Sequence, residues 1–332
     1  MDTRNKKVVF IDISSGVFDR HLTSFLYFLT THGYSVYIRP SVRVRISFAR
    51  NLYTKLMLDL EGVSLRYFKP ADMDIFISDR RGRGAIRISA DYFTPRSESS
   101  FHVPIAMHPQ LYTHGLYEKC AELRGNSERN IRIFFAGNFD RNYYGNTYIR
   151  PLFGKFTRLE LYDIVLEDLK HILRLPVSKK ELYAEGNRDL IIVDNAHFRI
   201  PMEELLEILA RSEFFLAFSG VHKPLCHNVV EAMALGCIPI LEYPEMLHPP
   251  LESGINCLSF SGRESFLTVI RQALALDAQK LEKMRKAALA YYREHLSPSA
   301  VVRDFESRLP GLRTIYINSG ITVRLLRRRE GV

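Results

Sequence analysis

The sequence lacks long apolar stretches, and it lacks the cysteine patterns of metal-bound or disulfide-rich proteins. A helix that spans a bilayer needs about 20 mostly apolar residues, and no run approaches this length. Residues 1–7 are polar and residues 8–13 are apolar for only the length of a strand, so no secretion signal is predicted. The cysteines show neither metal-ligand nor dense disulfide spacing: Cys120, Cys226, Cys237 and Cys257. We therefore expect buried thiols and a cytoplasmic protein.

Internal repeats, low-complexity tracts and long Pro/Ser linkers are also missing from the chain. Its 332 residues are too many for one small core and are sufficient for two domains of ordinary size. With 46% hydrophobic and 25% charged residues, the composition is that of a soluble globular protein.

Basic residues exceed acidic ones, mostly in the first part of the chain. The formal net charge is +9; residues 1–125 have 18 Lys and Arg against 12 Asp and Glu, and residues 126–332 have 28 against 25. A further basic cluster consists of Arg324, Arg327, Arg328 and Arg329. A basic face can bind an anionic acceptor, an anionic membrane surface or nucleic acid, or it can serve only for solubility. Peripheral membrane contact therefore stays open.

The first part of the chain alternates predicted strands and helices. Residues 7–13 read as a buried strand, residues 20–31 as a helix and residues 34–38 as the next strand. Residues 45–60 have the apolar stripe of one helix. Further strands are predicted at residues 74–78, 85–90 and 102–107. We expect a first domain over residues 1–125.

The second part repeats this alternation. Strands are predicted at residues 131–136 and 190–193. Helices are expected at residues 159–173, 201–210, 264–276 and 278–295. A last helix at residues 297–309 precedes the basic tail. The expected organisation is a second domain over residues 126–296, followed by a returning helix and tail over residues 297–332.

The most informative segment runs from Phe214 to Ile240. It reads as a strand to Phe218, a polar loop at residues 219–224, a helix at residues 226–235 that ends at Gly236, and a second strand. A loop between a buried strand and a helix directs backbone N–H groups and the positive helix end at a ligand, usually a phosphate. At helical spacing one face presents His227, Asn228 and Glu231.

The helix and strand of this segment, Glu231 to Ile240 (EAMALGCIPI), resemble the nucleotide-sugar motif of GT-B glycosyltransferases, including exostosin-like and group 1-like members. The resemblance covers residues 131–295 well and the first 125 residues only by topology. It implies an α/β fold with two facing Rossmann-like domains, each a parallel sheet flanked by helices. Many retaining members carry a second glutamate eight positions before the first, where this chain has Lys223. Their stereochemistry is therefore not carried over.

The resemblance implies a hexosyl- or pentosyltransferase that uses a nucleotide sugar as donor substrate and needs no cofactor. The acceptor would be a glycan or a lipid-linked glycan. Donor phosphates are expected to contact Gly137, Asn138, Arg141, His222, Lys223, His227 and Asn228, with Lys155 as a further cation nearby. Glu231 would bind the ribose, and the base would pack near His197, Phe198 and Ile200. As alternatives to ligand binding, Arg141 and Lys223 can be ordinary surface residues, and Ile200-Pro201 can simply start the next helix.

The first domain should supply the acceptor site and any catalytic base. The candidates are Asp19, His21 and His108, because a base must contact the acceptor hydroxyl. Each of them can instead be a solvated or helix-capping residue.

No metal site is predicted. Asp72-Met73-Asp74 has the Asp-x-Asp form that binds Mn²⁺ or Mg²⁺ in GT-A glycosyltransferases, but it precedes its strand, whereas ligands lie at carboxyl ends. We therefore expect metal-independent transfer. Two alternatives remain: a nucleotide-sugar epimerase of the same fold, and a basic nucleic-acid-binding α/β protein suggested by Arg80 to Gly84. A nucleic-acid partner is not expected, since the aromatic-basic motifs of RNA modules are missing.

Overall fold

The computed structural model describes residues 6–13, 20–80, 82, 84–126, 128–145, 148–186 and 188–331. By their contacts, residues 1–115 with 296–331 form one compact unit, and residues 116–295 form another. We call them unit 1 and unit 2. The division falls ten residues before the predicted boundary at residue 125. The helix that follows residue 296 belongs to unit 1.

Unit 1 is built on a seven-stranded sheet in which every strand pair is parallel. Its order is β3-β2-β1-β4-β5-β13-β6. The strands are β1 (Lys7–Asp12), β2 (Tyr34–Ile38), β3 (Val63–Leu65), β4 (Ile75–Ser78), β5 (Ile86–Ser89), β6 (Ser100–His102) and β13 (Thr314–Tyr316). The interior strand β1 is buried along nearly its whole length, as the apolar run at residues 8–13 predicts.

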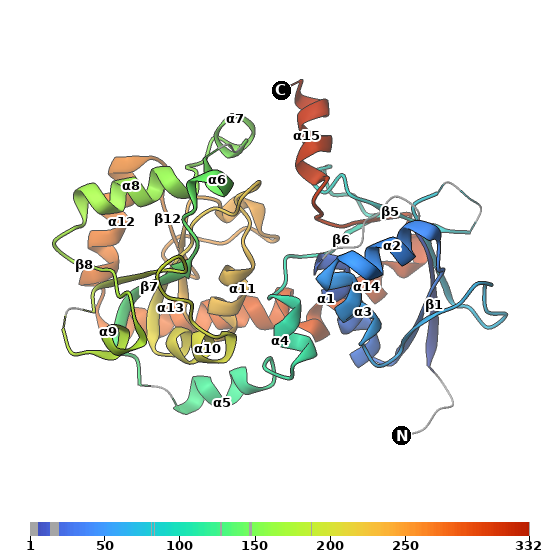
Figure 1. Ribbon diagram of the computed structural model, residues 1–332, viewed down its shortest axis with the longest axis horizontal. Coiled ribbons are helices and arrows are strands. Elements are labelled where there is room, and N and C mark those ends of the chain that lie inside the picture. Colours follow the sequence, from blue (N-terminus) through green and yellow to red (C-terminus); the bar gives the residue numbers. More distant parts are fainter. Residues whose placement is uncertain are drawn as a thin grey trace. The chain divides into compact units, whose positions relative to one another are not determined.

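Unit 1 contains several helices (Figure 1). They are α1 (Arg20–Thr31), α2 (Val42–Arg50), α3 (Leu52–Leu58), α4 (Pro109–Thr113), α14 (Pro298–Arg308) and α15 (Thr322–Glu330), with a 3₁₀ turn at Leu309–Gly311. Of these, α1, α3 and α14 contact strands of the sheet, while α2 and α4 pack on α1 or α3. In the core, Phe25 of α1 meets Phe305 of α14 edge to face, with the ring centroids 5.3 Å apart. The single helix predicted at residues 45–60 is wrong: Asn51 accepts hydrogen bonds from the N–H groups of Tyr53 and Thr54 and so starts a new helix.

Unit 2 is built on a six-stranded sheet that is also parallel throughout. Its order is β12-β11-β10-β7-β9-β8. The strands are β7 (Ile131–Gly137), β8 (Leu173–Arg174), β9 (Leu190–Asp194), β10 (Ser212–Leu216), β11 (Ile238–Leu241) and β12 (Leu258–Ser259). Their continuous apolar sequences are typical of strands covered on both faces.

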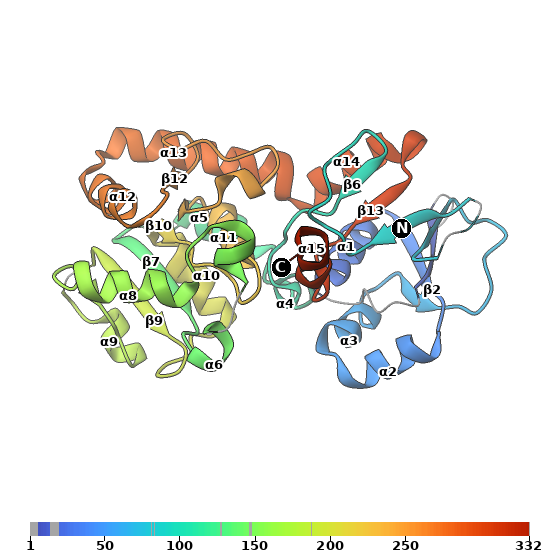
Figure 2. The same cartoon turned by 90° about the horizontal axis from the view of Figure 1, so that it is seen from above.

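Helices lie on both faces of this sheet (Figures 1 and 2). They are α5 (Lys119–Asn126), α6 (Arg141–Tyr144), α7 (Ile149–Phe153), α8 (Arg158–Asp168), α9 (Lys179–Tyr183), α10 (Met202–Ala210), α11 (His227–Ala234), α12 (Arg263–Ala275) and α13 (Ala278–Tyr291). A 3₁₀ turn occupies Pro244–Met246. The helix predicted to run to His295 ends at Tyr291 and continues as a π-helical turn at Tyr292–Leu296.

The two sheets confirm the predicted fold class, an α/β protein with two Rossmann-like units of parallel strands flanked by helices. Within the described ranges, no helix combines the length and apolarity that crossing a membrane requires. All four cysteines are buried and unpaired, as predicted. Burial raises the pKa of the Cys237 thiol to about 12, so this thiol stays protonated and unreactive near neutral pH.

Candidate functional site

The sheet of unit 2 has a topological switch point between β7 and β10. From β7 the chain continues to β8 and β9 on one side of it, and then to β10, β11 and β12 on the other side. In open parallel sheets, ligands bind outside the carboxyl ends of the strands at such a point. Two of the predicted site segments begin here: residues 138–141 follow β7, and residues 217–226 follow β10.

Gly137 is the last residue of β7 and has no room for a side chain. A Cβ atom there would lie 2.5 Å from the Phe135 ring and 3.1 Å from an Arg158 guanidinium nitrogen. The next residue, Asn138, accepts a hydrogen bond from the Asp140 N–H at 2.8 Å through its side-chain oxygen, which shapes the loop. Arg141 then begins α6 on the surface, where its guanidinium is 75% exposed and pairs with Asp163 at 3.3 Å.

Arg158, which was not among the predicted site residues, holds this edge together. The residue is buried in the first turn of α8. Its Nε donates to the Ser219 carbonyl at 2.9 Å, and one terminal nitrogen donates to the Asn138 carbonyl at 3.0 Å and to the Tyr144 hydroxyl at 2.9 Å. Arg158 thus joins the loops after β7 and β10. A cation in a first helical turn opposes the helix dipole, which is the one sequence signal that pointed to a special role.

Glu242 ties further loops to the same edge. It follows β11 and is buried. Its carboxylate accepts hydrogen bonds from the N–H groups of Phe156 at 2.5 Å and Gly262 at 3.4 Å. Burial raises the pKa of this carboxyl, and the two backbone donors partly offset the increase. A charged residue directly after the apolar strand Ile238–Leu241 was the sequence signal for it.

Tyr243, the next residue, is fully buried, and no described residue accepts or donates a hydrogen bond at its hydroxyl. Cys226, at the start of α11, and Arg158 both act electrostatically on this hydroxyl. Burial raises the pKa of Tyr243 well above its ordinary value, so the hydroxyl stays protonated and can donate a hydrogen bond. A buried polar atom without a partner is rare in native proteins and commonly meets water or a ligand.

The loop between β10 and α11 turns tightly at Gly220. The Gly220 N–H lies 3.4 Å from the Pro224 carbonyl, and a Cβ atom at Gly220 would be 2.9 Å from the Lys223 carbonyl oxygen. The predicted phosphate ligands His222 and Lys223 belong to this loop; His222 is exposed and Lys223 is half-buried. Lys155, the further cation, pairs with Glu245 at 2.7 Å.

The first turns of α11 carry the predicted ribose ligand. Glu231 is only 2% exposed, and its Oε1 lies 2.8 Å from Nδ1 of His227 one turn earlier. The i, i+4 spacing that predicted a shared face is therefore realised as a direct contact. Asn228 accepts a hydrogen bond from the Cys226 thiol at 3.1 Å. Among the residues that the structure describes, no side chain caps the start of this helix.

The predicted base-binding residues follow β9, the neighbour of β7 on the other side. The Asn195 N–H donates to the Gly137 carbonyl at 2.8 Å, which joins this loop to the end of β7. His197 is exposed and Phe198 is half-buried, whereas Ile200 is buried. His197 and Phe198 are therefore accessible to a ring, and Ile200 packs inside the unit.

The three predicted catalytic residues belong to unit 1. Asp19 lies outside the described residues. His21 is buried in the first turn of α1. His108 is the N-cap of α4: its Nδ1 accepts a hydrogen bond from the Gln110 N–H at 3.4 Å, and its Nε2 lies 3.4 Å from the Tyr53 hydroxyl. The capping role that was the alternative for these residues is thus present at His108.

The Asp72-Met73-Asp74 segment of unit 1 contributes to the structure of the sheet. Asp74 immediately precedes β4 and accepts a hydrogen bond from the Val8 N–H at 2.6 Å. The pair thus stands at the start of its strand, as the sequence indicated. Among the described residues, no three His, Cys, Asp or Glu side chains gather in an arrangement that could hold a metal ion.

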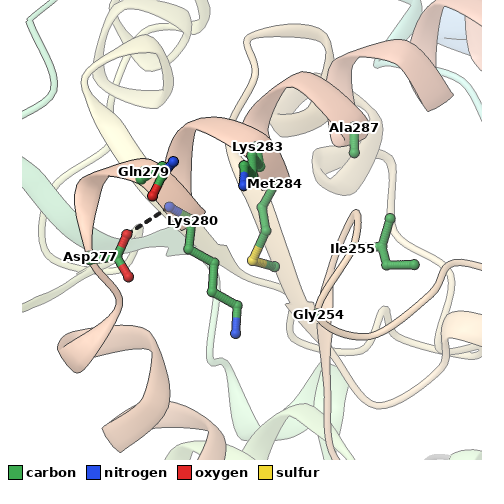
Figure 3. A pocket seen from close by; sticks show the side chains of 8 residues that line it. All are labelled: Gly254, Ile255, Asp277, Gln279, Lys280, Lys283, Met284 and Ala287. Atoms are coloured by element: carbon green, nitrogen blue, oxygen red, sulfur yellow. Dashed lines mark hydrogen bonds between the residues drawn. The ribbon is translucent and has the colours of Figure 1, made fainter.

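A cavity of about 510 Å³ in unit 2 has a different lining (Figure 3). Its walls come from the first turns of α13 and from the loop at Gly254 and Ile255. Asp277, the N-cap of α13, accepts a hydrogen bond from the Lys280 N–H at 2.8 Å. None of the lining residues belongs to the predicted donor site.

No protein-family model and no curated protein matches the chain. Among solved structures, it is similar to HepE of Anabaena in complex with UDP (12% identity, 92% of this chain and 100% of that one, TM-score 0.48). It is also similar to a glycosyltransferase from Rickettsia africae (13%, 92% and 99%, TM-score 0.49). A third is the N-terminal domain of trehalose-6-phosphate phosphatase from Candida albicans (8%, 92% and 97%, TM-score 0.48). A glycosyltransferase, the class that the sequence motif predicts, is among these structures. At these identities and TM-scores, the similarity assigns neither a substrate nor a site residue.

Proposed function

We propose that the chain is a glycosyltransferase that binds a nucleotide-sugar donor at the β7/β10 edge of unit 2. The observation that carries this proposal is Glu231, a buried carboxylate oriented by His227, in the helix that follows the switch-point loop. A carboxylate fixed in this way can accept both hydroxyls of a ribose. The surrounding sequence, Glu231 to Ile240, is the one that resembles the nucleotide-sugar motif.

The donor diphosphate would lie against the loops after β7 and β10. Gly137 and Gly220 keep side chains away from the backbone there, and the uncapped start of α11 offers N–H groups and the positive end of the helix dipole. In this proposal Asn138, Asn228 and His227 contribute polar contacts, while His222, Lys223 and Arg141 contribute positive charge. His197 and Phe198 would lie beside the base.

In the reaction, an acceptor hydroxyl oxygen bonds to the anomeric carbon as the bond from that carbon to the diphosphate oxygen breaks. The acceptor proton passes to a base, and the nucleoside diphosphate leaves with the bonding electron pair. Negative charge on the leaving group grows in the transition state, so a nearby cation such as Lys223 favours the transition state over the bound donor. His21 and His108 remain the described candidates for the base, and a glycan or lipid-linked glycan remains the proposed acceptor.

The proposal is tested by calorimetric titration with UDP, GDP, CDP and their sugar conjugates. One nucleotide should bind, and Glu231→Gln should weaken it by about 1.5–3 kcal/mol, roughly 10- to 150-fold in Kd, because a charge-assisted hydrogen bond to ribose is lost. Glu264→Gln, at an exposed carboxylate in the first turn of α12, is the matched control and should leave the affinity unchanged. Unchanged affinity in Glu231→Gln would remove Glu231 from the site.

A second measurement separates transfer from epimerisation and from metal-dependent chemistry. Incubation of the bound nucleotide sugar alone should leave it intact, since a transferase needs an acceptor; conversion to an epimer would favour the alternative enzyme. With an acceptor, transfer should survive EDTA because side-chain cations and the helix end neutralise the phosphates. Activity lost in EDTA and restored by Mn²⁺ would contradict that assignment.

A further inference from the structure

Unit 1 exposes large apolar side chains in one short stretch of its sequence. Phe68 is 82% exposed and Val42 is 75% exposed. Within the described part of unit 1, every strongly exposed large hydrophobic side chain lies in this stretch, namely Val42, Ile46, Leu52, Leu65, Tyr67 and Phe68. In unit 2, by contrast, such side chains are scattered from Tyr143 to Ile255. Scattered exposure is ordinary, whereas a contiguous exposed group marks an interaction surface.

Helix α2, helix α3 and the segment from β3 to Phe68 carry these side chains, and α3 packs against both α2 and β3. Val42 and Ile46 are one turn apart on α2, and Tyr67 and Phe68 follow the edge strand β3. Arg45 of α2 donates a hydrogen bond to the Tyr67 hydroxyl, and its guanidinium lies 5.7 Å from the centroid of the Tyr67 ring. These neighbouring elements carry all six side chains, and we call the surface that they expose the apolar–basic patch.

Cations surround the apolar side chains of the patch. Residues 39–69 contain seven Lys and Arg against two Asp and Glu. The exposed cations here are Arg39, Arg45, Arg50, Lys55, Arg66 and Lys69. Two of them lie over aromatic rings, Arg66 over Tyr37 and Lys69 over Phe76, which fixes their stems along the protein surface. Unit 1 as a whole has 23 Lys and Arg against 13 Asp and Glu.

We propose that the apolar–basic patch docks unit 1 onto the surface of an anionic lipid bilayer. Phenylalanine and tyrosine favour the interfacial layer of a membrane, and each Lys or Arg near an anionic surface adds about 1 kcal/mol of attraction. No helix of the described chain can span a bilayer, so the protein would lie on the membrane. A second copy of the chain is a poor occupant, because two equally basic patches would repel each other. The proposal is independent of the nucleotide-sugar chemistry of unit 2.

The first test is sedimentation of the full chain with vesicles. We expect binding to phosphatidylcholine vesicles that contain phosphatidylglycerol, little binding to phosphatidylcholine alone, and weaker binding as salt increases. The double variant Tyr67→Ser with Phe68→Ser should lose at least about tenfold in partition coefficient without any change of charge. Leu175→Ser with Val177→Ser, at exposed apolar positions of unit 2, is the matched control and should bind like the wild type. Equal losses in the two double variants would overturn the proposal.

The second test separates the patch from general attraction to a basic protein. Arg66→Glu with Lys69→Glu should lower the partition coefficient at least about tenfold. Arg324→Glu with Arg328→Glu reverses two exposed cations on α15, outside the patch, and changes the net charge by the same amount. This control should lose less than the patch variant. Equal loss in both, or self-association through the patch seen by light scattering, would overturn the assignment.

The chain contains no tryptophan, which permits a direct reporter of insertion. Phe68→Trp introduces a single tryptophan in the patch, and Val177→Trp places one at an exposed position of unit 2. Anionic vesicles should shift the emission of the Phe68→Trp protein to the blue and leave that of the Val177→Trp protein unchanged. A different result would assign the surface to nucleic acid: the protein binds an RNA oligomer, Arg66→Glu weakens that binding, and vesicles cause no blue shift in the Phe68→Trp protein.

Discussion

Unit 1 has 23 Lys and Arg against 13 Asp and Glu, whereas unit 2 has 23 against 24, although each unit is built on a parallel sheet flanked by helices. The net positive charge of the chain therefore belongs entirely to unit 1. Exposed cations of unit 1 include those beside the apolar side chains of residues 42–68, while unit 2 buries Arg158, Glu231 and Glu242. The same architecture thus exposes apolar and basic side chains together in one unit and buries charged groups in the other.

The two switch points show this difference most clearly. In unit 1 the chain order reverses between β1 and β4, where Asp12 pairs with Arg39 at 2.9 Å and the Ser78 hydroxyl donates to the Asp12 carbonyl. Half of the Arg39 side chain is exposed. In unit 2, Arg158 is buried and bonds to neutral acceptors on two loops. We therefore expect the edge of unit 2 to depend more strongly on its arginine.

The largest effect is expected for Arg158→Ala. Removal of this guanidinium leaves the Ser219 and Asn138 carbonyls without their donor and should destabilise unit 2 by roughly 3–5 kcal/mol, since hydrogen bonds to charged groups are worth about 1.5–3 kcal/mol each. Urea unfolding followed by circular dichroism measures the change. Arg141→Ala, at an exposed surface pair, is the matched control and should stay within about 1 kcal/mol of the wild type. Similar losses in the two variants would contradict the role of Arg158 in joining the loops.

A smaller effect is expected for the corresponding arginine of unit 1. Arg39→Ala should cost about 1–3 kcal/mol, because half of the Arg39 side chain is already in water but its removal leaves the buried Asp12 carboxylate without this donor. The same urea experiment measures it. A loss as large as that of Arg158→Ala would show that the two switch points are equivalent and would remove the contrast between the units.

The sequence predicted the parts of this molecule that depend on local pattern. The strand, loop and helix at residues 214–236, and the contact between His227 and Glu231, follow from spacing along one segment. The break at Asn51 was missed because the apolar stripe at residues 45–60 continues across a residue whose side chain caps a new helix.

Arg158 and Glu242 could not be assigned from pattern because their partners are distant in the sequence. Arg158 bonds to a carbonyl 61 residues away, and Glu242 accepts from an N–H group 86 residues away. Their contacts exist only once β7, β10 and β11 are assembled side by side. The sequence shows only that Glu242 is a charged residue next to a buried strand and that Arg158 is a cation in a first helical turn. Neither observation identifies the group to which the side chain bonds.

The smallest expected effect concerns the ties between the start of the chain and α14 in unit 1. Glu306 accepts hydrogen bonds from Lys7 at 2.5 Å and from the Tyr34 hydroxyl at 2.7 Å. The Lys7 ammonium and then the Tyr34 hydroxyl lower the pKa of the Glu306 carboxyl below its usual range. Burial raises the pKa of Tyr34, so its hydroxyl remains a donor at neutral pH.

Because the pKa of Glu306 is lower in the folded state, its contribution is fully present above the ordinary glutamate pKa of about 4.3 and is lost as pH falls through the folded value. The side chain is partly exposed, so the contribution should not exceed about 1 kcal/mol. Urea midpoints measured from about pH 7 to about pH 3 should show the wild type more stable than Glu306→Gln at the upper end, with the difference shrinking below about pH 5. Tyr34→Phe keeps the ring and removes one hydrogen-bond donor to Glu306. At neutral pH its stability should therefore lie between that of the wild type and that of Glu306→Gln. A gap between wild type and Glu306→Gln that stays constant with pH would show that the carboxylate charge contributes nothing, and that Glu306 serves unit 1 through packing alone.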